Sequence, residues 1–442
     1  MLLSNDETWR VSVEEVALDV LQPVLEEPTE KVLEVKLPRS GSKSQRKIMW
    51  HSNAPWVGSG YGQQSALFVP LISEMLGYES AFSAFYGLQG SRLGWVSQSG
   101  APFIVYPGGF DGHGNDVLGA HTKHWFGEGG GLVVALTDPW VLAPMIVERL
   151  PMLAWTPVDH DPLMPRTHEW LMASKALPIA MSRFGERMIR EAGHETVFYV
   201  PHGFDPNVFH PVVREEARDA FQIPHSAFVV GMVAMNLGIP SRKCFAEAIQ
   251  AFGIFQQHHD DALLYLHTKL ETPDGEDLPM LCKANKVRAM SSDQYGLALG
   301  VPASAVGAMM SGFDILLNPS RGEGFGIPML ESQACGTPVI TTDFSSQPEV
   351  APAEMGNWNV GGQMTWTPFE SFQKTPSVEQ LVEALEEAYA DSEDERHNRR
   401  HSVYAHAMAN YQARDIVETY WKPVLEQAEV EFGWRQQLLQ RY

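Results

Sequence analysis

The stretch from Asp314 to Val350 constrains the fold of this chain more than any other. It opens with a short apolar run, Ile315 to Leu317, of the length and flanks typical of a buried parallel strand. A polar loop rich in glycine follows, and residues Ile327 to Cys335 then have the pattern of a helix. A second apolar run, Pro338 to Thr342, predicts the next strand of the same sheet.

The loop between this strand and helix has the composition of a phosphate-binding loop. Its glycines, Gly322, Gly324 and Gly326, let backbone N–H groups face an anion, which the positive end of the helix dipole also favours. Two carboxylates flank it, Glu323 before the helix and Glu331 inside it. The five steps from Gly326 to Glu331 span roughly 7.5 Å in a helix, so the two acids cannot share one proton or one metal without distortion. They suit the two ends of a ligand with an anionic middle, such as a sugar nucleotide.

Strands alternate with helices elsewhere in the chain, which predicts doubly wound parallel sheets. Residues Gly87 to Gly114 form a long irregular insertion around one strand, and a second series of elements begins at Phe228. The expected strands before it are Lys47–Ser52, Ala81–Tyr86, Pro102–Tyr106, Gly131–Leu136, Met152–Pro157, Pro178–Ser182 and Thr196–Val200.

The letters E-G-F-G-I-P-M-L-E, followed by A-C-G-T-P-V-I, resemble the E-x7-E signature of retaining glycosyltransferases of the GT-B fold, family four in particular. Two glutamates at this spacing are uninformative alone, but the glycines, the preceding N-P-S-R and the following G-T-P-V-I make the match specific. The resemblance covers about residues 47 to 425. Similar motifs also occur in bacteria and bacteriophages, where acceptors include surface glycans and structural proteins.

The resemblance implies an α/β protein with two Rossmann-like domains facing a cleft. We expect an N-terminal arm, partly helical, at residues 1–46, and an acceptor domain at 47–207. A donor domain at 208–415 and a C-terminal helix at 416–442, packing back on the first domain, complete the chain. Trp421 and Trp434 suit that packing. In the segment between the domains, His202 stands where the family usually has asparagine.

The implied activity is transfer of a hexose-type sugar from a UDP- or GDP-sugar to a hydroxyl of a glycan or protein, with retention and without a metal. No tightly bound cofactor is expected. Glu323 would bind sugar hydroxyls and balance charge at the anomeric carbon, while Glu331 would hold the ribose. The loop N–H groups of Gly324, Phe325 and Gly326 would face the phosphates. The loop after Met290 lies where relatives hold the base.

The family's phosphate-binding lysine and arginine have one clear counterpart here. Lys243 matches the lysine, but the position usual for the arginine falls near Asn236, which is neutral. Either Arg242 replaces that arginine or Arg321 contributes from the neighbouring loop. In a chain of net charge −22, adjacent arginine and lysine residues form a conspicuous local positive site.

The strand ending near Pro157 runs into Val158-Asp159-His160-Asp161, which allows two interpretations. Asp159-x-Asp161 matches the D-x-D metal clamp of the other large glycosyltransferase fold, GT-A, although that fold lacks the glutamate pair. In GT-B relatives, a histidine or an acid at this strand end faces the donor sugar. His160 or Asp159 would fill that role, unless the segment is only a polar loop capping the next helix.

A glycine loop follows the first strand, with Gly58, Gly60 and Gly62 before a probable helix. It is one residue short of the dinucleotide-binding pattern, so it is either a tight turn or, as the resemblance implies, a loop whose backbone approaches the donor diphosphate or the acceptor. His121 and His124 have a spacing that would put both on one helix face, but no acid or cysteine completes a metal site.

Composition excludes several classes of protein. The net charge of −22 argues against a nucleic-acid surface or strong association with anionic membranes. The first residues lack the basic and apolar regions of a signal peptide. An odd number of cysteines, Cys244, Cys282 and Cys335, without paired spacing suggests reduced thiols in a cytoplasmic protein. Homo-oligomer formation is open.

Two other activities fit the same fold at this stage. A sugar-nucleotide epimerase would isomerise its donor without an acceptor, whereas a phosphorylase would need phosphate or a pyridoxal-binding lysine motif, which the sequence lacks. A non-catalytic carbohydrate-binding protein is the third alternative. Glu323, Glu331 and Lys243 argue against it, because only donor binding or catalysis requires all three.

Overall fold

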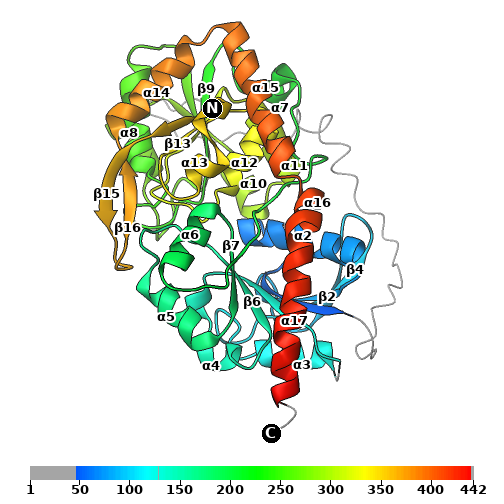
Figure 1. The fold of residues 1–442 in the computed structure, drawn as a ribbon. Coiled ribbons are helices and arrows are strands. Elements are labelled where there is room, and N and C mark those ends of the chain that lie inside the picture. Colours follow the sequence, from blue (N-terminus) through cyan, green and yellow to red (C-terminus); the bar gives the residue numbers. More distant parts are fainter. Residues whose placement is uncertain (1–45, 128, 440–442) are drawn as a thin grey trace. The chain divides into compact units, whose positions relative to one another are not determined.

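The computed structural model describes residues 46–127 and 129–439, with backbone only from residue 434 onward. Nearly all of the expected N-terminal arm therefore lies outside the described residues. The rest divides into two compact units (Figure 1). We call them the N-terminal unit (residues 46–203, 366–372 and 411–439) and the C-terminal unit (residues 204–365 and 373–410), and describe each by itself.

The N-terminal unit is built on an eight-stranded sheet of order β3-β4-β2-β1-β5-β6-β7-β8. All neighbours pair in parallel except β3 and β4, which are antiparallel. The strands are β1 (Lys47–Asn53), β2 (Glu79–Tyr86), β3 (Leu93–Val96), β4 (Pro102–Tyr106), β5 (Leu132–Leu136), β6 (Met152–Thr156), β7 (Leu177–Ala180) and β8 (Phe198–Tyr199). Strand β3 lies in the insertion that the sequence predicted to hold one strand only.

The helices of this unit connect the strands in the doubly wound manner that the sequence predicts. They are α2 (Gly60–Leu76), α3 (Leu118–Phe126), the short turns η1 (Pro139–Val141) and α4 (Pro144–Val147), α5 (Pro165–Ser174) and α6 (Arg183–Glu191). Ser59 and Ser182 cap α2 and α6 by accepting hydrogen bonds from backbone N–H groups of the first turn, which fixes where each helix begins.

The C-terminal end of the chain belongs to the N-terminal unit, as predicted. It forms α16 (Ala413–Ile416), a π-helical turn η3 (Val417–Trp421) and α17 (Lys422–Leu439), which runs along this unit in Figure 1. The Trp421 ring is fully buried, with its centroid 5.5 Å from that of Trp50 and 5.0 Å from that of Trp155. This tryptophan cluster ties the last elements to the central strands β1 and β6.

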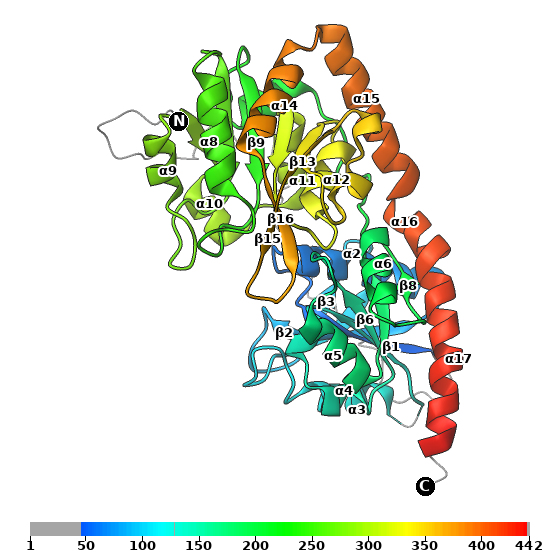
Figure 2. The same cartoon turned by 60° about the vertical axis from the view of Figure 1, so that its left-hand side comes forward.

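The C-terminal unit has a six-stranded parallel sheet of order β11-β10-β9-β12-β13-β14. Helices α8 and α14 lie side by side on it (Figure 2). The strands are β9 (Phe228–Val233), β10 (Ala262–His267), β11 (Ala289–Ser291), β12 (Ile315–Asn318), β13 (Val339–Thr342) and β14 (Trp358–Val360). The helices are α7 (Arg214–Ala220), α8 (Phe245–Gln256), α9 (Leu278–Ala284), α10 (Gln294–Leu299), α11 (Ala303–Ser311), α12 (Ile327–Ala334), α13 (Gln347–Val350), the short turn η2 (Ala353–Met355), α14 (Val378–Ala390) and α15 (Glu393–Asn410).

The core of this unit forms where the apolar face of α8 meets the sheet. Phe245, Ile249, Phe252 and Phe255 recur at helical spacing, and all four are fully buried against strands such as β9 and β10. Burial of each such side chain contributes roughly 1.5–3 kcal/mol relative to exposure. This packing fixes the start of α8, where Arg242 and Lys243 lie just before the helix.

A two-stranded hairpin, β15 (Gly362–Trp366) and β16 (Phe372–Pro376), is an element that the sequence did not predict. Its tip, residues 366–372, belongs to the N-terminal unit, whereas the rest of the hairpin belongs to the C-terminal unit. Within the N-terminal unit, Asp161 and Phe372 exchange two backbone hydrogen bonds of 3.0 and 3.2 Å. The tip is thereby fixed on the loop that follows β6.

Across the described ranges, no helix combines the length and the apolar character needed to cross a membrane.

Candidate functional site

The glycine loop and α12 have the geometry that the sequence predicted. Strand β12 ends at Asn318, and α12 begins at Ile327 after Gly326, whose φ of +94° is a left-handed value that favours glycine. A Cβ atom at this position would lie 2.1 Å from the terminal carbon of Met329, so a larger residue would also clash. The backbone N–H groups at the start of α12 accordingly lie next to the loop that carries Glu323.

Three charged side chains from two loops meet in front of α12. The Glu323 carboxylate accepts hydrogen bonds from the Lys243 ammonium group and, at 3.1 Å, from the Arg242 guanidinium. Arg242 also donates to the backbone carbonyl of Gly322, and the Arg321 N–H donates to the carbonyl of Arg242 at 2.9 Å. The structure thus brings together Glu323, Lys243 and Arg242, which is one of the two arginines that the sequence left open.

The electrostatics of Glu323 follow from this arrangement. Burial alone would raise the pKa of its carboxyl group, but the neighbouring Lys243 and Arg242 charges outweigh that effect and lower the pKa to about 2. A mostly buried glutamate therefore stays ionised at every physiological pH. One carboxylate and two cations form a compact group in which an incoming anion can replace the carboxylate as partner of the cations.

Glu331 has the opposite electrostatic environment. It lies inside α12 and is buried, it forms no ion pair with any of residues 46–127 and 129–439, and burial raises the pKa of its carboxyl group to about 8. Burying an ionised carboxylate without a partner is costly, so this group is protonated at neutral pH in the ligand-free protein. The two acids of the E-x7-E pattern therefore differ in charge.

The remaining donor-side candidates lie in the same unit but have different surroundings. Arg321 lies 3.5 Å from the Glu247 carboxylate, and its Nε atom and the Asn318 amide nitrogen are buried without a hydrogen-bond partner among the described residues. Asn236 uses its amide to bind the backbone of Lys269 and Glu276, which holds the 269–276 loop.

Phe325 and Met290 are both buried. Phe325 lies in the loop before α12, and Met290 lies in β11. Gly324 precedes Phe325 in the same loop.

The glycine loop of the N-terminal unit precedes α2, as predicted. A Cβ atom at Gly62 would lie 2.3 Å from the Val57 carbonyl oxygen, so the tight turn itself requires this glycine. At Gly58 a Cβ atom would meet nothing within 4 Å, so packing does not explain this residue. Gly60 is the first residue of α2.

Asp159 and His160 form a hydrogen-bonded pair after β6, in the N-terminal unit. The His160 Nδ1 atom lies 2.6 Å from the Asp159 carboxylate, and Nε2 lies 3.2 Å from the Thr367 hydroxyl of the hairpin tip. His160 is only 2% exposed, whereas the Asp159 side chain is 19% exposed. Both ring nitrogens of His160 thus contact protein groups, and Asp159 is the more accessible member of the pair.

The Thr367 hydroxyl has a defined set of partners. It donates to the Ser371 carbonyl oxygen at 2.8 Å and accepts from the Phe369 N–H at 3.2 Å. The same hydroxyl lies 3.2 Å from His160 Nε2, within hydrogen-bond distance. Sequence analysis missed Thr367, because no local motif places residue 367 beside residue 160.

His121 and His124 both lie on α3 but bind different hydroxyl groups. His121 Nδ1 lies 3.0 Å from Ser83 Oγ, and His124 Nδ1 lies 2.7 Å from the Tyr106 hydroxyl. Burial lowers the pKa of His121 to about 4. Among residues 46–127 and 129–439, no group of three or more histidine, cysteine or acidic side chains is arranged to hold a metal ion.

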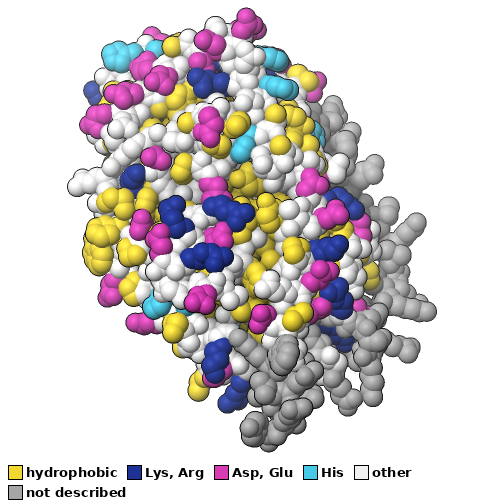
Figure 3. Space-filling view, viewed as in Figure 1, with side chains coloured by type: hydrophobic (Ala, Val, Ile, Leu, Met, Phe, Trp, Pro, Cys, Tyr) yellow, Lys and Arg dark blue, Asp and Glu magenta, His cyan; other side chains and the backbone are white. Residues whose placement is uncertain are grey.

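The surface shown in Figure 3 mixes basic and acidic side chains, and on that face lysine and arginine lie among aspartate and glutamate. This matches the excess of 54 acidic over 32 basic residues in the chain. The Arg242 and Lys243 pair is identified by its contacts with Glu323 and by its place before α8.

Comparison with known proteins gives one family match and many similar structures. Residues 214–405, most of the C-terminal unit, match the family described as glycosyl transferases group 1. No curated protein matches the chain.

Sucrose-phosphate synthase from Thermosynechococcus elongatus is 14% identical, with a TM-score of 0.64, and the match covers 90% of this chain and 100% of that one. A glycosyltransferase from Rickettsia africae is 12% identical, with a TM-score of 0.62 and coverage of 87% and 98%. HepE from Anabaena, solved in complex with UDP-glucose, is 16% identical, with a TM-score of 0.62 and coverage of 86% and 99%. Together these likenesses show that the chain has the GT-B fold, with two Rossmann-like units and a C-terminal helix, as predicted.

Proposed function

We propose that this protein is a retaining, metal-independent glycosyltransferase that moves a hexose-type sugar from a nucleoside-diphosphate donor to an acceptor hydroxyl. The observation that carries the proposal is the cluster of Glu323, Lys243 and Arg242 in front of α12. It lies within the residues that match group 1 glycosyl transferases. A buried acid, two cations and a helix N-terminus are the groups that a sugar diphosphate requires.

The diphosphate is bound by the two cations and by the N–H groups of Gly324, Phe325 and Gly326. Lys243 and Arg242 exchange the Glu323 carboxylate for phosphate oxygens, which releases Glu323 to accept hydrogen bonds from sugar hydroxyls. Glu331 binds the ribose hydroxyls. The unpaired buried donors on Asn318 and Arg321 lie in the same loop region and are available to an acceptor group on the ligand.

The reaction breaks the bond between the anomeric carbon and the phosphate oxygen, and forms a bond from that carbon to the acceptor oxygen. The acceptor proton passes to the leaving phosphate, so no protein nucleophile is needed for attack on the same face. Lys243 and Arg242 stabilise the charge that grows on the leaving group, and ionised Glu323 balances the positive anomeric centre. Preorganised charges in a partly buried site supply the stabilisation that other glycosyltransferases obtain from a metal.

In the N-terminal unit, Asp159 or His160 is assigned to the donor sugar. Asp159 is the better choice for direct contact, because it is the more exposed of the pair and His160 already binds protein groups through both nitrogens. His160 then holds the Asp159 carboxylate in place. Gly58 and Gly60 allow close approach of the donor or acceptor to the start of α2.

We assign UDP or GDP as the nucleotide, and a glycan or protein as the acceptor. The Anabaena protein of similar fold is described in complex with UDP-glucose, which makes UDP-glucose the first donor to test. The excess of acidic residues argues against strong association with anionic membranes, and the odd number of cysteines without paired spacing favours a cytoplasmic enzyme.

The proposal is tested in two steps. UDP, GDP and their sugars should raise the melting temperature of the protein, and the best ligand should be hydrolysed slowly or transferred when an acceptor is added. Glu323→Gln should lower transfer at least several hundred-fold, because the carboxylate that balances the anomeric charge is lost. Wild-type turnover in a folded Glu323→Gln protein would refute the assigned role.

Epimerase and phosphorylase activities are less well supported, since group 1 glycosyl transferases are the family that matches. Donor isomerisation without acceptor, or transfer that requires inorganic phosphate, would identify them. Transfer that requires Mn²⁺ and is lost on chelation would instead favour a D-x-D role for Asp159 and Asp161.

A further inference from the structure

A second charged feature lies in the N-terminal unit, at the start of α5. The Arg166 guanidinium lies between two aromatic rings, with its central carbon 4.6 Å from the ring centroid of Trp140 and 4.6 Å from that of Phe369. Trp140 comes from η1 and Phe369 from the hairpin tip, so two separate segments hold this one side chain.

Arg166 has no carboxylate within ion-pair distance and no hydrogen-bond acceptor among the residues that the structure describes. Other arginines of this unit differ: Arg183 and Arg190 both pair with Glu186. Stacking fixes the plane of the Arg166 guanidinium and leaves its N–H groups at the edge of that plane. A planar fork of donors is suited to the two oxygens of a carboxylate or phosphate.

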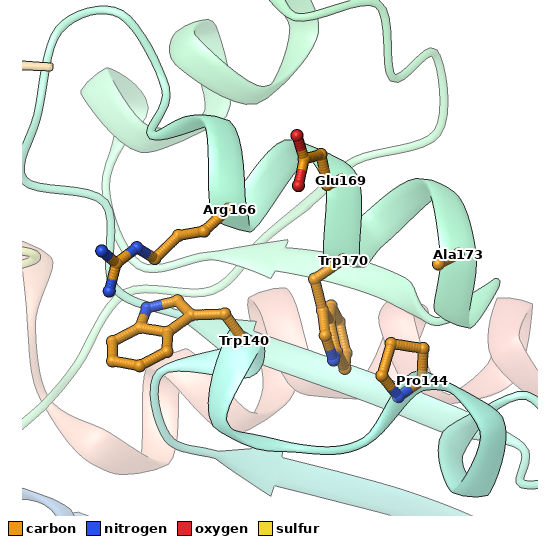
Figure 4. Close-up of a pocket in the computed structure, with 6 residues that line it drawn as sticks. All are labelled: Trp140, Pro144, Arg166, Glu169, Trp170 and Ala173. Atoms are coloured by element: carbon orange, nitrogen blue, oxygen red, sulfur yellow. The ribbon is translucent and has the colours of Figure 1, made fainter. Parts of the chain in front are cut away.

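The stacked arginine borders an open hollow of about 470 Å³ (Figure 4). Figure 4 shows Arg166 extending over the Trp140 ring, while the Glu169 carboxylate lies apart from the guanidinium. The hollow is lined by Trp140, Pro144, Arg166, Glu169, Trp170 and Ala173. Apolar rings and alkyl groups form most of its wall, with one cation and one anion at separate places. This combination suits a sugar unit that carries a negative group.

The hollow adjoins the strand end that carries Asp159 and His160. Arg166 follows His160 by six residues, and the Phe369 ring contacts both side chains, with a centroid distance of 5.5 Å to His160. A ligand that reached Arg166 would therefore extend from the loop after β6, which the proposed function assigns to the reacting sugars.

From these contacts we infer that the hollow binds a sugar unit of the acceptor that bears an oxyanion, and that Arg166 recognises the oxyanion. Only the assignment of the bound sugar to the acceptor substrate rests on the proposed function. The carboxylate of an acidic sugar and the phosphate of a sugar phosphate share the required chemistry. The Trp140 ring and Pro144 contact the sugar ring, and Glu169 is placed to accept hydrogen bonds from its hydroxyls.

Ligand-observed NMR titrations of the full chain test this inference. D-glucuronate or D-glucose 6-phosphate should bind at least tenfold more tightly than D-glucose at low salt, and the preference should shrink in 0.5 M salt because screening weakens the ion pair. Whichever of the two anions binds more tightly shows whether the site prefers a carboxylate or a phosphate. Arg166→Gln should abolish the preference, whereas Arg187→Gln, a change of an exposed arginine on α6, should leave it intact.

Equal binding of charged and neutral sugars, or an unchanged preference in folded Arg166→Gln, would overturn the inference. If Arg166→Gln does not fold, Arg166→Lys becomes the deciding variant, because it keeps the charge but loses the planar fork. In this variant the preference for the charged sugar over D-glucose should be at least threefold smaller than in wild type. An unchanged preference would contradict the assignment of Arg166 to the oxyanion. These titrations contain no donor and measure no transfer, so their outcome is separate from that of the glycosyltransferase proposal.

Discussion

At the scale of single residues, the protonation state of each acid in the site depends on which charged side chains lie next to it. Glu323 keeps a low pKa although it is buried, because Lys243 and Arg242 lie beside it. Glu331, eight positions later on α12, pairs with no cation in the described part of the chain, and burial raises its pKa. The sequence showed both acids and their spacing. It could not show their opposite protonation states, since these depend on which loop from elsewhere in the chain lies next to each acid.

Lys243→Ala should weaken binding of free UDP or GDP by roughly tenfold to a hundredfold, as expected when one charge-assisted hydrogen bond of about 1.5–3 kcal/mol is lost. Isothermal titration calorimetry measures the change. Lys283→Ala, at an exposed position near the end of α9, removes the same charge and serves as control. Equal affinity of Lys243→Ala and wild type would remove Lys243 from the phosphate site.

Nucleotide binding should release a proton from Glu331. Its carboxyl group is protonated below a pKa of about 8 in the free protein, and a carboxylate that accepts two ribose hydroxyls must be ionised. Affinity should therefore rise as pH increases from 6 toward 8 and then level off. Calorimetry in buffers of different ionisation enthalpy counts the protons released. Glu331→Gln should lose this component, and a proton count identical to wild type would contradict the assignment.

At the scale of elements, the helices and strands that could be predicted from the sequence were those with strong local sequence patterns. The strand–loop–helix from Ile315 to Ala334 was predicted because an apolar run, a glycine loop and a helical pattern occur in direct succession. The hairpin β15–β16 was missed because its strands are partly exposed and lack an apolar alternation. Asn236, predicted to bind the donor, uses its amide for a loop more than thirty residues away, which no local pattern reveals. Its role at the donor stays a prediction.

Thr367→Val should lower kcat/KM about tenfold, as is typical when a group that orients a reactive side chain is removed. Valine keeps the shape of threonine but has no hydroxyl group to hydrogen-bond with His160 Nε2. Thr367→Ser should restore activity to within about twofold, which loss of packing alone would not allow. ¹⁵N NMR of the histidine ring nitrogens should show a shifted Nε2 signal in Thr367→Val only.

Thr375→Val is the matched control for that experiment, since Thr375 lies in the same hairpin and its hydroxyl binds Thr365 at 2.8 Å. Unchanged ring-nitrogen signals in Thr367→Val would show that Thr367 does not position His160.

At the scale of the whole molecule, buried neutral histidines should make the fold sensitive to acid. Burial is the main cause that lowers the pKa of His51 and His267 to about 4 and of His202 to about 3, all from an ordinary value of 6.5. The unfolded chain therefore takes up protons below pH 6.5 while the folded chain does not. Stability should fall as pH drops from 6.5 toward 4, by about 1.4 kcal/mol per pH unit for each fully buried histidine.

Urea unfolding at a series of pH values measures this slope. The His202→Asn variant should take up about one proton fewer on unfolding, so its unfolding free energy should depend less steeply on pH. Asparagine is the residue usual at this position in the family that the sequence resembles. Exposed His397→Asn on α15 should leave the slope unchanged. The same pH dependence in wild type and in His202→Asn would contradict the prediction.

Because each unit is built from discontinuous segments of the chain, the protein cannot be expressed as two separate units by one cut in the sequence. A cut after Gly203 leaves the first product without the hairpin tip and without Trp421, which closes the tryptophan cluster around Trp50 and Trp155. The second product carries a terminal helix whose apolar partners are gone. Expressed separately, both products should expose aromatic surface and aggregate, whereas joint expression should let them reassemble. The two units are therefore separate compact parts of the fold, but neither corresponds to one continuous stretch of the sequence.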